Sequence, residues 1–363
     1  MKVAFISRAS LYKDKGGDTI QLVNTAVHLR KLGIQVDIFL ADESPDYSTY
    51  DLLHFFNIIR PDDILPHITG SERPFVVSTI FVDYSEYEKK ARQGPSAVLF
   101  KFLSPDSIEY LKVLARFITN GAKIKSTYYL FHGQKRSIRK IIKMAQMLLP
   151  NSKSEYERLR QSYGIQQKYS IVPNGIDNNL FIPRNAGILR DDRLVLCVAR
   201  IEGRKNQLNL IRAVVNTPYR LILIGAMATN QKDYYQQCKR AAGPNVEFID
   251  FLEQESLLNY YQKARVHVLP SWFETTGLSS LEAAAMGCNI VITRKGDARE
   301  YFEDYAYYCD PESPDSIFKA IEQASSNSIQ PGLSELVREK YTWEVAARKT
   351  LDAYVEILEI QSY

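Results

Sequence analysis

The sequence lacks any run of about 18 consecutive apolar residues, the length that a membrane-spanning helix needs. Its start, MKVAFISRAS, is typical of a buried strand rather than of a signal peptide. Cysteine is scarce, with four residues in 363 and no C-x-x-C pair, which predicts reduced structural thiols. The dinucleotide fingerprint G-x-G-x-x-G is also absent. We therefore expect a cytoplasmic protein, soluble or peripheral on the inner face of a membrane.

What the sequence does contain is a regular alternation of short apolar runs with amphipathic stretches. This pattern is typical of parallel sheets built from β-α-β units. A chain of 363 residues with 45% hydrophobic residues can form about two such domains. We expect strands at 3–7, 36–40, 52–56, 75–80 and 170–172, and in the second half at 194–198, 221–224, 246–249, 266–269 and 289–292.

A turn-rich stretch that begins at Pro173 separates the two series of strands. We place the boundary there, with an N-terminal domain over 1–175 and a C-terminal domain over 176–342. Ligands of open α/β sheets bind at the carboxyl ends of the strands. The expected fold class is therefore α/β, with two Rossmann-like, doubly wound parallel-sheet domains facing a central cleft.

Two glutamates eight residues apart, Glu274 and Glu282, are the most informative feature of the chain. The first closes a loop after the apolar run 266–269, and the second lies in an Ala-rich helix. Both are expected near one helix N-terminus, whose unpaired N–H groups and partial positive charge suit a pyrophosphate. Carboxylates beside it can accept hydrogen bonds from hydroxyls. The arrangement predicts a nucleotide-sugar site, although either glutamate alone is also explained as a partner of the helix dipole.

The segment around these glutamates resembles the donor-site signature of the retaining glycosyltransferases of family four, close to F-E-x-x-G-L-x-x-x-E-A-x-A-x-G. The matching residues are Glu274, Gly277, Leu278, Glu282, Ala283, Ala285 and Gly287. Further matches follow in order along nearly the whole chain, at Gly16-Gly17, 172–177, 200–205, 296–300 and 341–344. The resemblance implies a GT-B fold, in which a last helix over 343–363 crosses back to the N-terminal domain. That domain would bind the acceptor, and the C-terminal domain the nucleotide-sugar donor.

The resemblance also implies roles for individual residues. Arg200 and Lys205 would neutralise the diphosphate, since fixed cations stabilise a leaving group that gathers negative charge. Glu274, with the backbone that follows it, would hold the sugar hydroxyls, and Glu282 would accept from the ribose. The catalytic residues would be Arg200, Lys205 and Glu274, and the other donor-binding residues Gly16, Gly17, Gly225, Phe251, Leu252, Thr275, Thr276, Gly277, Leu278 and Glu282.

The chain departs from the family in two places. Gly225 is followed by Ala-Met instead of completing G-D-G, and the His that many relatives carry after the fourth strand is missing. Asp83 or His132 could replace that His, while His54 matches a strand-end His of the family or is a core residue. No Asp-x-Asp loop follows a strand, so we expect no catalytic metal and no cofactor besides the nucleotide-sugar co-substrate.

The segment 86–146 is strongly basic, with thirteen Lys or Arg against four acidic residues, a net charge of +9 in a chain of net charge +4. Aromatic and aliphatic residues interleave the cations. This pattern favours an anionic membrane surface or a lipid diphosphate over nucleic acid, or else it marks a solvated helical face.

The sequence therefore predicts a metal-independent, retaining glycosyltransferase. It would move a sugar from a nucleotide-diphosphate sugar to a glycan or lipid-linked acceptor, as in cell-surface polysaccharide synthesis. Two alternatives stay open. One is a GT-B sugar-nucleotide epimerase or phosphorylase, for which no motif is present. The other is a non-catalytic nucleotide-sugar-binding protein, which the missing His suggests.

Overall fold

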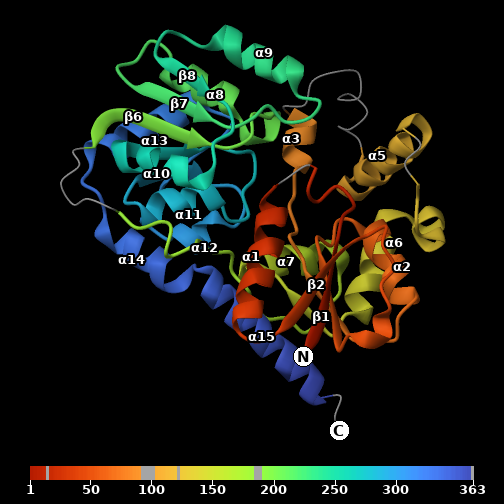
Figure 1. The fold of residues 1–363 in the computed structure, drawn as a ribbon. Coiled ribbons are helices and arrows are strands. Elements are labelled where there is room, and N and C mark those ends of the chain that lie inside the picture. Colours follow the sequence, from red (N-terminus) through yellow and green to blue (C-terminus); the bar gives the residue numbers. More distant parts are fainter. Residues whose placement is uncertain (14–15, 91–102, 121–122, 184–189, 361–363) are drawn as a thin grey trace. The chain divides into compact units, whose positions relative to one another are not determined.

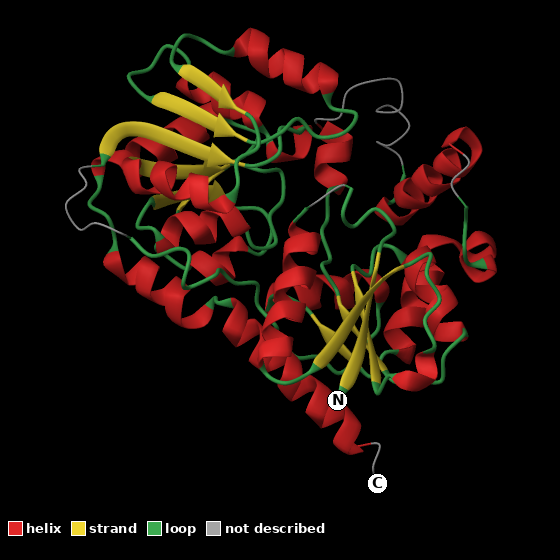
Figure 2. Ribbon diagram, in the orientation of Figure 1, coloured by secondary structure: helices red, strands yellow, loops and turns green. Residues whose placement is uncertain are grey.

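The structure, a computed structural model, describes residues 1–13, 16–90, 103–120, 123–183 and 190–360. The chain forms two compact units, each built on its own parallel sheet (Figures 1 and 2). Unit 1 comprises Met1–Ser85, Gly94–Asn174 and Trp343–Tyr363, and unit 2 comprises Glu86–Gln93 and Gly175–Thr342. Of the described residues, 86–90 thus group with the second half of the chain, although the sequence-based division had them within 1–175.

The sheet of unit 1 has the order β2-β1-β3-β4-β5, and all its strands are parallel. Every residue of β3 and β4 is buried, because helices cover both faces of such a sheet. The strands are β1 (Lys2–Ser7), β2 (Gln35–Leu40), β3 (Leu52–Phe56), β4 (Phe75–Ser78) and β5 (Met147–Leu149).

The fifth strand corrects the sequence analysis, which expected it at 170–172. That stretch runs beside β5, where Ser170 and Val172 donate backbone hydrogen bonds to the carbonyls of Leu148 and Pro150. It forms no ladder of its own, only an isolated bridge at Tyr169. Pro173 follows directly and has no N–H with which to extend the pairing.

Helices cover the two faces of this sheet with different sets of side chains. A core cluster on one face joins Leu53 and Phe55 of β3 to α2, α6 and α7. His54, between them in sequence, points to the opposite face, as the alternation of a strand requires. The helices of unit 1 are α1 (Gly17–Lys31), α2 (Pro61–Thr69), α5 (Pro105–Asn120), α6 (Thr127–Met144), α7 (Lys153–Tyr163) and α15 (Trp343–Ile360), with the short η1 (Tyr47–Thr49); α3 (Ser85–Lys90) follows β4.

The C-terminal helix α15 belongs to unit 1 and contacts it in the first turn and again further along the helix. Its Glu344 lies 3.3 Å from the ring Nε2 of His28 on α1. Further along α15, the hydroxyl of Tyr354 lies 2.5 Å from Nδ1 of His54 on β3. The Nε2 of His54 in turn lies 2.8 Å from the hydroxyl of Ser78 on β4. His54 and Tyr354 are both fully buried. Burial lowers the pKa of His54 to about 3, so this imidazole is neutral.

The sheet of unit 2 has the order β11-β10-β9-β6-β7-β8, again all parallel. Its strands are β6 (Asp191–Val198), β7 (Arg220–Ile224), β8 (Val246–Ile249), β9 (Ala264–Leu269), β10 (Asn289–Thr293) and β11 (Tyr307–Cys309). The edge strand β11 was not predicted, because its three residues carry too little pattern to be read. The two parallel sheets of this α/β topology confirm the predicted fold class.

Alternate residues of the central strand β6 divide unit 2 into two core clusters. Leu194 and Leu196 pack with α10, α11, α12 and α14 on one face. Val195 and Cys197 pack with α8, α9 and α13 on the other. The helices are α8 (Gln207–Val214), α9 (Lys232–Ala241), α10 (Gln254–Lys263), α11 (Leu278–Ala285), α12 (Ala298–Phe302), α13 (Pro314–Ser326) and α14 (Pro331–Lys340), with the short η2 (Gly203–Lys205).

The hydrogen bond between Tyr354 and His54 should matter for the stability of unit 1. Replacing Tyr354 with Phe leaves a buried imidazole nitrogen without its partner, which typically costs about 1–3 kcal/mol. We expect a lower melting temperature for this variant in differential scanning calorimetry. Tyr307→Phe, which removes an exposed hydroxyl bond to Asn327, is the control and should leave the melting temperature nearly unchanged. Equal melting temperatures for Tyr354→Phe and the wild type would contradict the assigned role.

Candidate functional site

The predicted donor-site residues lie on loops that follow neighbouring strands of unit 2. Arg200 and Lys205 come after β6, Gly225 after β7, Phe251 after β8 and Glu274 after β9. These four strands are adjacent in the sheet, in the order β9-β6-β7-β8. Because parallel strands end at the same edge, the sheet brings the loops together there, where ligands of α/β sheets bind.

An ion pair joins two of these loops. The Lys205 ammonium lies 2.5 Å from Oε1 of Glu274, and the hydroxyl of Ser271 donates to the same oxygen at 2.6 Å. The Glu274 side chain is only 7% exposed, against 22% for Lys205. Burying a carboxylate is costly unless it has a charged or hydrogen-bonding partner, and Lys205 and Ser271 both supply one. The sequence analysis predicted Lys205 and Glu274 but not their contact, and it missed Ser271.

Backbone contacts hold Glu274 between two further loops. The N–H of Trp272 donates to the carbonyl of Arg204 at 2.9 Å, and the N–H of Glu274 donates to the carbonyl of Lys295 at 3.2 Å. The N–H of Asp297 returns a bond of 2.8 Å to the carbonyl of Glu274. Gly296 is required in this last loop, because a Cβ there would lie 2.0 Å from the Glu274 carbonyl oxygen. The loops after β6, β9 and β10 are therefore interlocked around Glu274.

Glu282, on α11, sits in a different environment from Glu274. Its Oε2 accepts a hydrogen bond of 2.9 Å from the hydroxyl of Tyr261, and its Oε1 accepts one of 3.0 Å from the amide of Gln254. Burial raises the pKa of the Glu282 carboxyl to about 7, against the two hydrogen bonds, which lower it. The sequence analysis predicted the glutamate but missed Tyr261 and Gln254, which lie on α10.

The turn that opens α11 carries the remaining residues of the signature. Gly277 is the N-cap of α11 in a left-handed conformation, and no side chain caps the helix there. Thr276 is buried, whereas Thr275 and Leu278 are partly exposed. The start of α11 therefore has no side-chain cap, and binding of an anion there stays a prediction.

The other predicted residues of unit 2 make fewer contacts with one another than Lys205 and Glu274 do, or contact other segments. Arg200 is 45% exposed and its guanidinium lies 3.4 Å from the carboxylate of Glu202. Phe251 is 62% exposed just after β8, while Leu252 packs against the core. Gly225 does approach another segment closely, but that segment is β6: a Cβ there would lie 2.1 Å from the carbonyl oxygen of Ala199.

The predicted site residues of unit 1 lie in different local environments. Gly16 and Gly17 begin α1, where the Asp18 carboxylate is paired with Arg8 at 2.7 Å. His132 is exposed and stacks on Tyr128 with ring centroids 4.1 Å apart. The side chain of Asp83 accepts a hydrogen bond of 2.8 Å from the N–H of Ser85. Of the two interpretations of His54, the structure supports the core residue: the side chain is fully buried and lies within hydrogen-bond distance of Tyr354 and Ser78.

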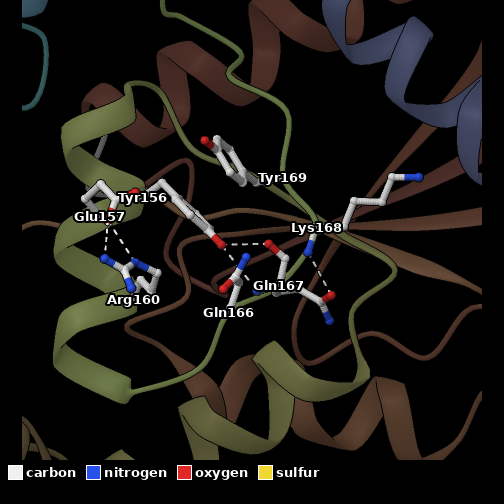
Figure 3. Close-up of a pocket in the computed structure, with 7 residues that line it drawn as sticks. All are labelled: Tyr156, Glu157, Arg160, Gln166, Gln167, Lys168 and Tyr169. Atoms are coloured by element: carbon white, nitrogen blue, oxygen red, sulfur yellow. Dashed lines mark hydrogen bonds and ion pairs between the residues drawn. The ribbon is translucent and has the colours of Figure 1, made fainter.

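A pocket at the end of α7 contains none of the predicted site residues (Figure 3). The rings of Tyr156 and Tyr169 stack there with centroids 3.7 Å apart. Its charged side chains have partners, since Arg160 pairs with Glu157 at 2.7 Å and Lys168 with Glu356 at 2.8 Å. We assign no ligand to this surface groove.

Three further expectations concern what the chain lacks. None of the described helices is both long and apolar enough to cross a bilayer. Within the described ranges, no three His, Cys, Asp or Glu side chains are grouped so as to hold a metal ion, and metal independence stays a prediction. The four cysteines, Cys197, Cys238, Cys288 and Cys309, are buried and unpaired.

Two doubly wound parallel sheets, with charged loops at the carboxyl edge of the second, define the fold as GT-B. The whole chain is similar in fold to a solved sucrose-phosphate synthase from Thermosynechococcus elongatus, with a TM-score of 0.78 at 18% identity, over 99% of this chain and all of that one. The model of the family "Glycosyl transferases group 1" matches residues 179–342, which include Lys205, Glu274 and Glu282.

Sequence relatives are glycosyltransferases by name. One is an uncharacterised glycosyltransferase of Methanocaldococcus jannaschii, 26% identical over 54% of this chain and 56% of that protein. Another, from Campylobacter jejuni, is N-acetylgalactosamine-N,N'-diacetylbacillosaminyl-diphospho-undecaprenol 4-alpha-N-acetylgalactosaminyltransferase, 23% identical over 91% of this chain and 89% of that protein. The match thus spans little more than half of the first relative and most of the second.

The raised pKa of Glu282 predicts a pH dependence of stability. The folded protein keeps this proton up to about pH 7, whereas the unfolded chain releases it near 4.5, so the stability contributed by Glu282 falls as the pH rises between these values. Glu282→Gln removes the ionisation. Relative to wild type, the variant should gain up to roughly 3 kcal/mol between pH 5 and pH 8.

Urea unfolding of both proteins at the two pH values measures this gain. Any constant effect of the new amide cancels in the difference between pH values. The exposed Glu322→Gln on α13 is the control, and its stability should follow that of the wild type. The difference in stability between Glu282→Gln and wild type should therefore change with pH. If it stays constant, the pKa of Glu282 is not raised in the folded protein.

Proposed function

We propose that this chain is a glycosyltransferase that transfers a sugar from a nucleotide-diphosphate sugar to a glycan or lipid-linked acceptor. The observation that supports this most is the Lys205–Glu274 pair beside the uncapped start of α11. It places a cation, a helix start with no side-chain cap and a buried hydroxyl acceptor at one edge of one sheet. A diphosphate needs the first two, and a sugar needs the third.

Each member of the site has a chemical task in this proposal. The ammonium of Lys205 has three N–H donors, so it can bind Glu274 and a phosphate oxygen together. It would stabilise the nucleotide as it leaves, with Arg200 as the second cation. Glu274 would accept from sugar hydroxyls, and Glu282, already bonded to two neutral donors, would accept from the ribose. The exposed ring of Phe251 is available for the base.

Membership in family four, retention of configuration and independence of metal are parts of the same proposal. In that family the departing phosphate is thought to assist attack on the same face, so no side-chain nucleophile is needed. This makes the burial of His54 and the missing His after β4 compatible with activity. The alternatives of an epimerase, a phosphorylase or a non-catalytic binding protein are outcomes that the next experiment separates.

A panel of UDP-, GDP- and ADP-sugars should identify the donor, because a bound ligand raises the melting temperature by mass action. With that donor, free nucleotide should appear when a polyprenyl-diphosphate-linked sugar is added, in the presence of EDTA as well as without it. The product should show the donor's anomeric configuration by NMR coupling constants. Lys205→Ala should lower kcat about 100- to 1000-fold, the usual cost of losing a fixed transition-state charge.

Lys319→Ala is the matched control, because Lys319 is exposed on α13 and pairs only with Asp315 of its own helix. It should keep the wild-type rate. Donor binding without nucleotide release would favour a binding protein, and conversion of the donor with no acceptor present would favour an epimerase. Equal rates for Lys205→Ala and wild type would remove Lys205 from the mechanism.

We further propose that unit 1 meets an anionic membrane surface through α6. The helix buries Ile138, Ile141 and Ile142 against the core and exposes the opposite face. That face, which we call the basic face, carries Lys135, Arg136, Arg139, Lys140 and Lys143. Not all cations of the segment take part: Lys112 and Lys125 have acidic partners, and residues 91–102 and 121–122 lie outside the described ones.

Apolar side chains are exposed on α5 and at the start of α6, the helix that carries the basic face. Phe131, at the start of α6, is 80% exposed, and on α5 Phe117 and Ile118 are 50% and 78% exposed. Tyr110 of α5 donates a hydrogen bond to the carbonyl of Leu130 at 2.6 Å, which ties the two helices together. Cations beside exposed apolar side chains fit the headgroup region of an anionic bilayer. The Campylobacter relative acts, by its name, on an undecaprenyl diphosphate, which is a membrane lipid.

Binding to anionic vesicles should depend on the basic face. Each cation near a charged bilayer contributes about 1 kcal/mol that salt screens. We therefore expect co-sedimentation with vesicles of phosphatidylglycerol, weaker at high salt and absent with phosphatidylcholine alone. Replacing Lys135, Arg136, Arg139 and Lys140 with Glu should release the protein.

A control variant carries the same change in charge elsewhere, with Lys232, Arg240, Lys263 and Lys319 replaced by Glu on exposed positions of α9, α10 and α13. It should still sediment with the vesicles. Equal loss in both variants would mean that net charge alone governs binding. If the wild type does not sediment with the vesicles, the basic face is a solvated helix surface with no role in membrane binding.

A further inference from the structure

The helix α3 comes from the first half of the sequence, yet its residues from Glu86 onward belong to unit 2. Its side chains contact the loops after β6, β9 and β10, which are the loops interlocked around Glu274. Nothing in the sequence pattern indicated this placement, since α3 lies within the segment that was interpreted by its charge.

Tyr87 packs over the loop after β6. Its hydroxyl lies so close to Gly203 that a Cβ on that glycine would be 2.1 Å from it. On its other side, the ring centroid of Tyr87 lies 6.3 Å from that of Trp272, two residues before Glu274. Glu88 is buried to 3% exposure, and its carboxylate lies 3.5 Å from the guanidinium of Arg204. The helix therefore contacts both segments that the Trp272–Arg204 backbone bond joins.

A ring of four alternating charges ties α3 to the loop after β10. The carboxylate of Glu86 contacts Lys295 at 2.6 Å and Lys90 at 2.8 Å. Glu312 closes the ring, at 2.9 Å from Lys295 and 2.8 Å from Lys90. We call these residues the charge ring. Lys295 is the residue whose carbonyl accepts the N–H of Glu274.

We propose that α3 is a clamp for the donor site, with Glu86, Tyr87 and Glu88 as positioning residues for Lys205 and Glu274. They touch no reacting atom. They act by adding contacts to three loops that also touch one another directly, as where Asn206 donates to the carbonyl of Pro270 and the Lys295 ammonium lies over the ring of Trp272. A misplacement of about 1 Å in a catalytic group can cost about 100-fold in rate, so a clamp at this position has a direct effect on catalysis. The inference rests on the donor role proposed for Lys205 and Glu274.

Reversing one charge of the ring tests the clamp. Lys295→Glu puts a third acidic side chain into the ring, against Glu86 and Glu312, and leaves the backbone carbonyl of residue 295 in place. In the ligand-free protein, we expect hydrogen exchange of the peptides covering 200–206 and 270–277 to accelerate about tenfold or more, since the loops open more often. With the donor identified above, kcat/KM should fall about 10- to 100-fold.

A fourfold swap tests whether the alternation of charge, rather than any single side chain, holds the loops. Glu86→Lys, Lys90→Glu, Lys295→Glu and Glu312→Lys together restore the alternation of charge around the ring. This variant should recover wild-type exchange and kcat/KM within about threefold, because the four ion pairs form again with their signs exchanged. Tyr87→Ala supplies an independent loss of the clamp without any change in charge. Lys319→Glu, a reversal on α13 away from the three loops, is the control and should behave as wild type.

The exchange measurement needs no ligand, so it decides the inference even if the proposed function fails. Wild-type exchange in both Lys295→Glu and Tyr87→Ala would overturn the clamp. So would a fall in kcat/KM that the fourfold swap does not restore. A wild type that neither binds nor transfers any sugar of the panel would instead overturn the proposed function, and faster exchange in the variants would still support the clamp.

Discussion

The contact between Lys205 and Glu274 is the interaction on which the rest of the site depends. It joins residues 69 positions apart in sequence, on loops after two adjacent strands, β6 and β9. Breaking one side of such a buried pair leaves an uncompensated charge and typically costs about 3–5 kcal/mol. The backbone bonds of Trp272, Glu274 and Asp297 keep the carboxylate at this point, so the loops and the ion pair stabilise one another. An anion or a hydroxyl that approaches this edge meets charges whose positions are already set.

The two glutamates of the signature illustrate how environment separates identical side chains. Glu274 faces an ammonium, whereas Glu282 meets only the neutral donors Tyr261 and Gln254 in the core. Without a cation to offset its burial, the pKa of Glu282 rises to about 7. A carboxyl that is easily protonated suits hydrogen bonding to neutral hydroxyls better than it suits charge stabilisation. This difference in environment supports different tasks for the two residues in the proposed function.

In unit 1, the helix α6 separates buried apolar side chains from exposed charged ones. A kink at Gly133, with a φ of 70°, separates the first turn of α6 from the rest of the helix. The first turn presents Phe131, and the remainder buries isoleucines while its cations face outward. The acidic residues Glu86 and Glu88 of α3 pair with Lys295 and Arg204 of unit 2, whereas the cations of the basic face lie on α6 in unit 1. One basic stretch of sequence thus contributes to both units.

Several features were determined by the sequence alone. Strong apolar periodicity predicted most strands of both sheets, and the spacing of Glu274 and Glu282 predicted the turn and helix between them. Periodicity failed where an element is short, because β5 and β11 have only three residues each. It also assigned a strand to 170–172, which Pro173 prevents. Only the tertiary structure decided that Lys205 meets Glu274, that His54 is sealed by Tyr354 at a separation of 300 residues, and that α3 joins unit 2. The reason is that periodicity reports which face of an element is buried, whereas partners are chosen by strand order and loop packing, which no local stretch of sequence contains.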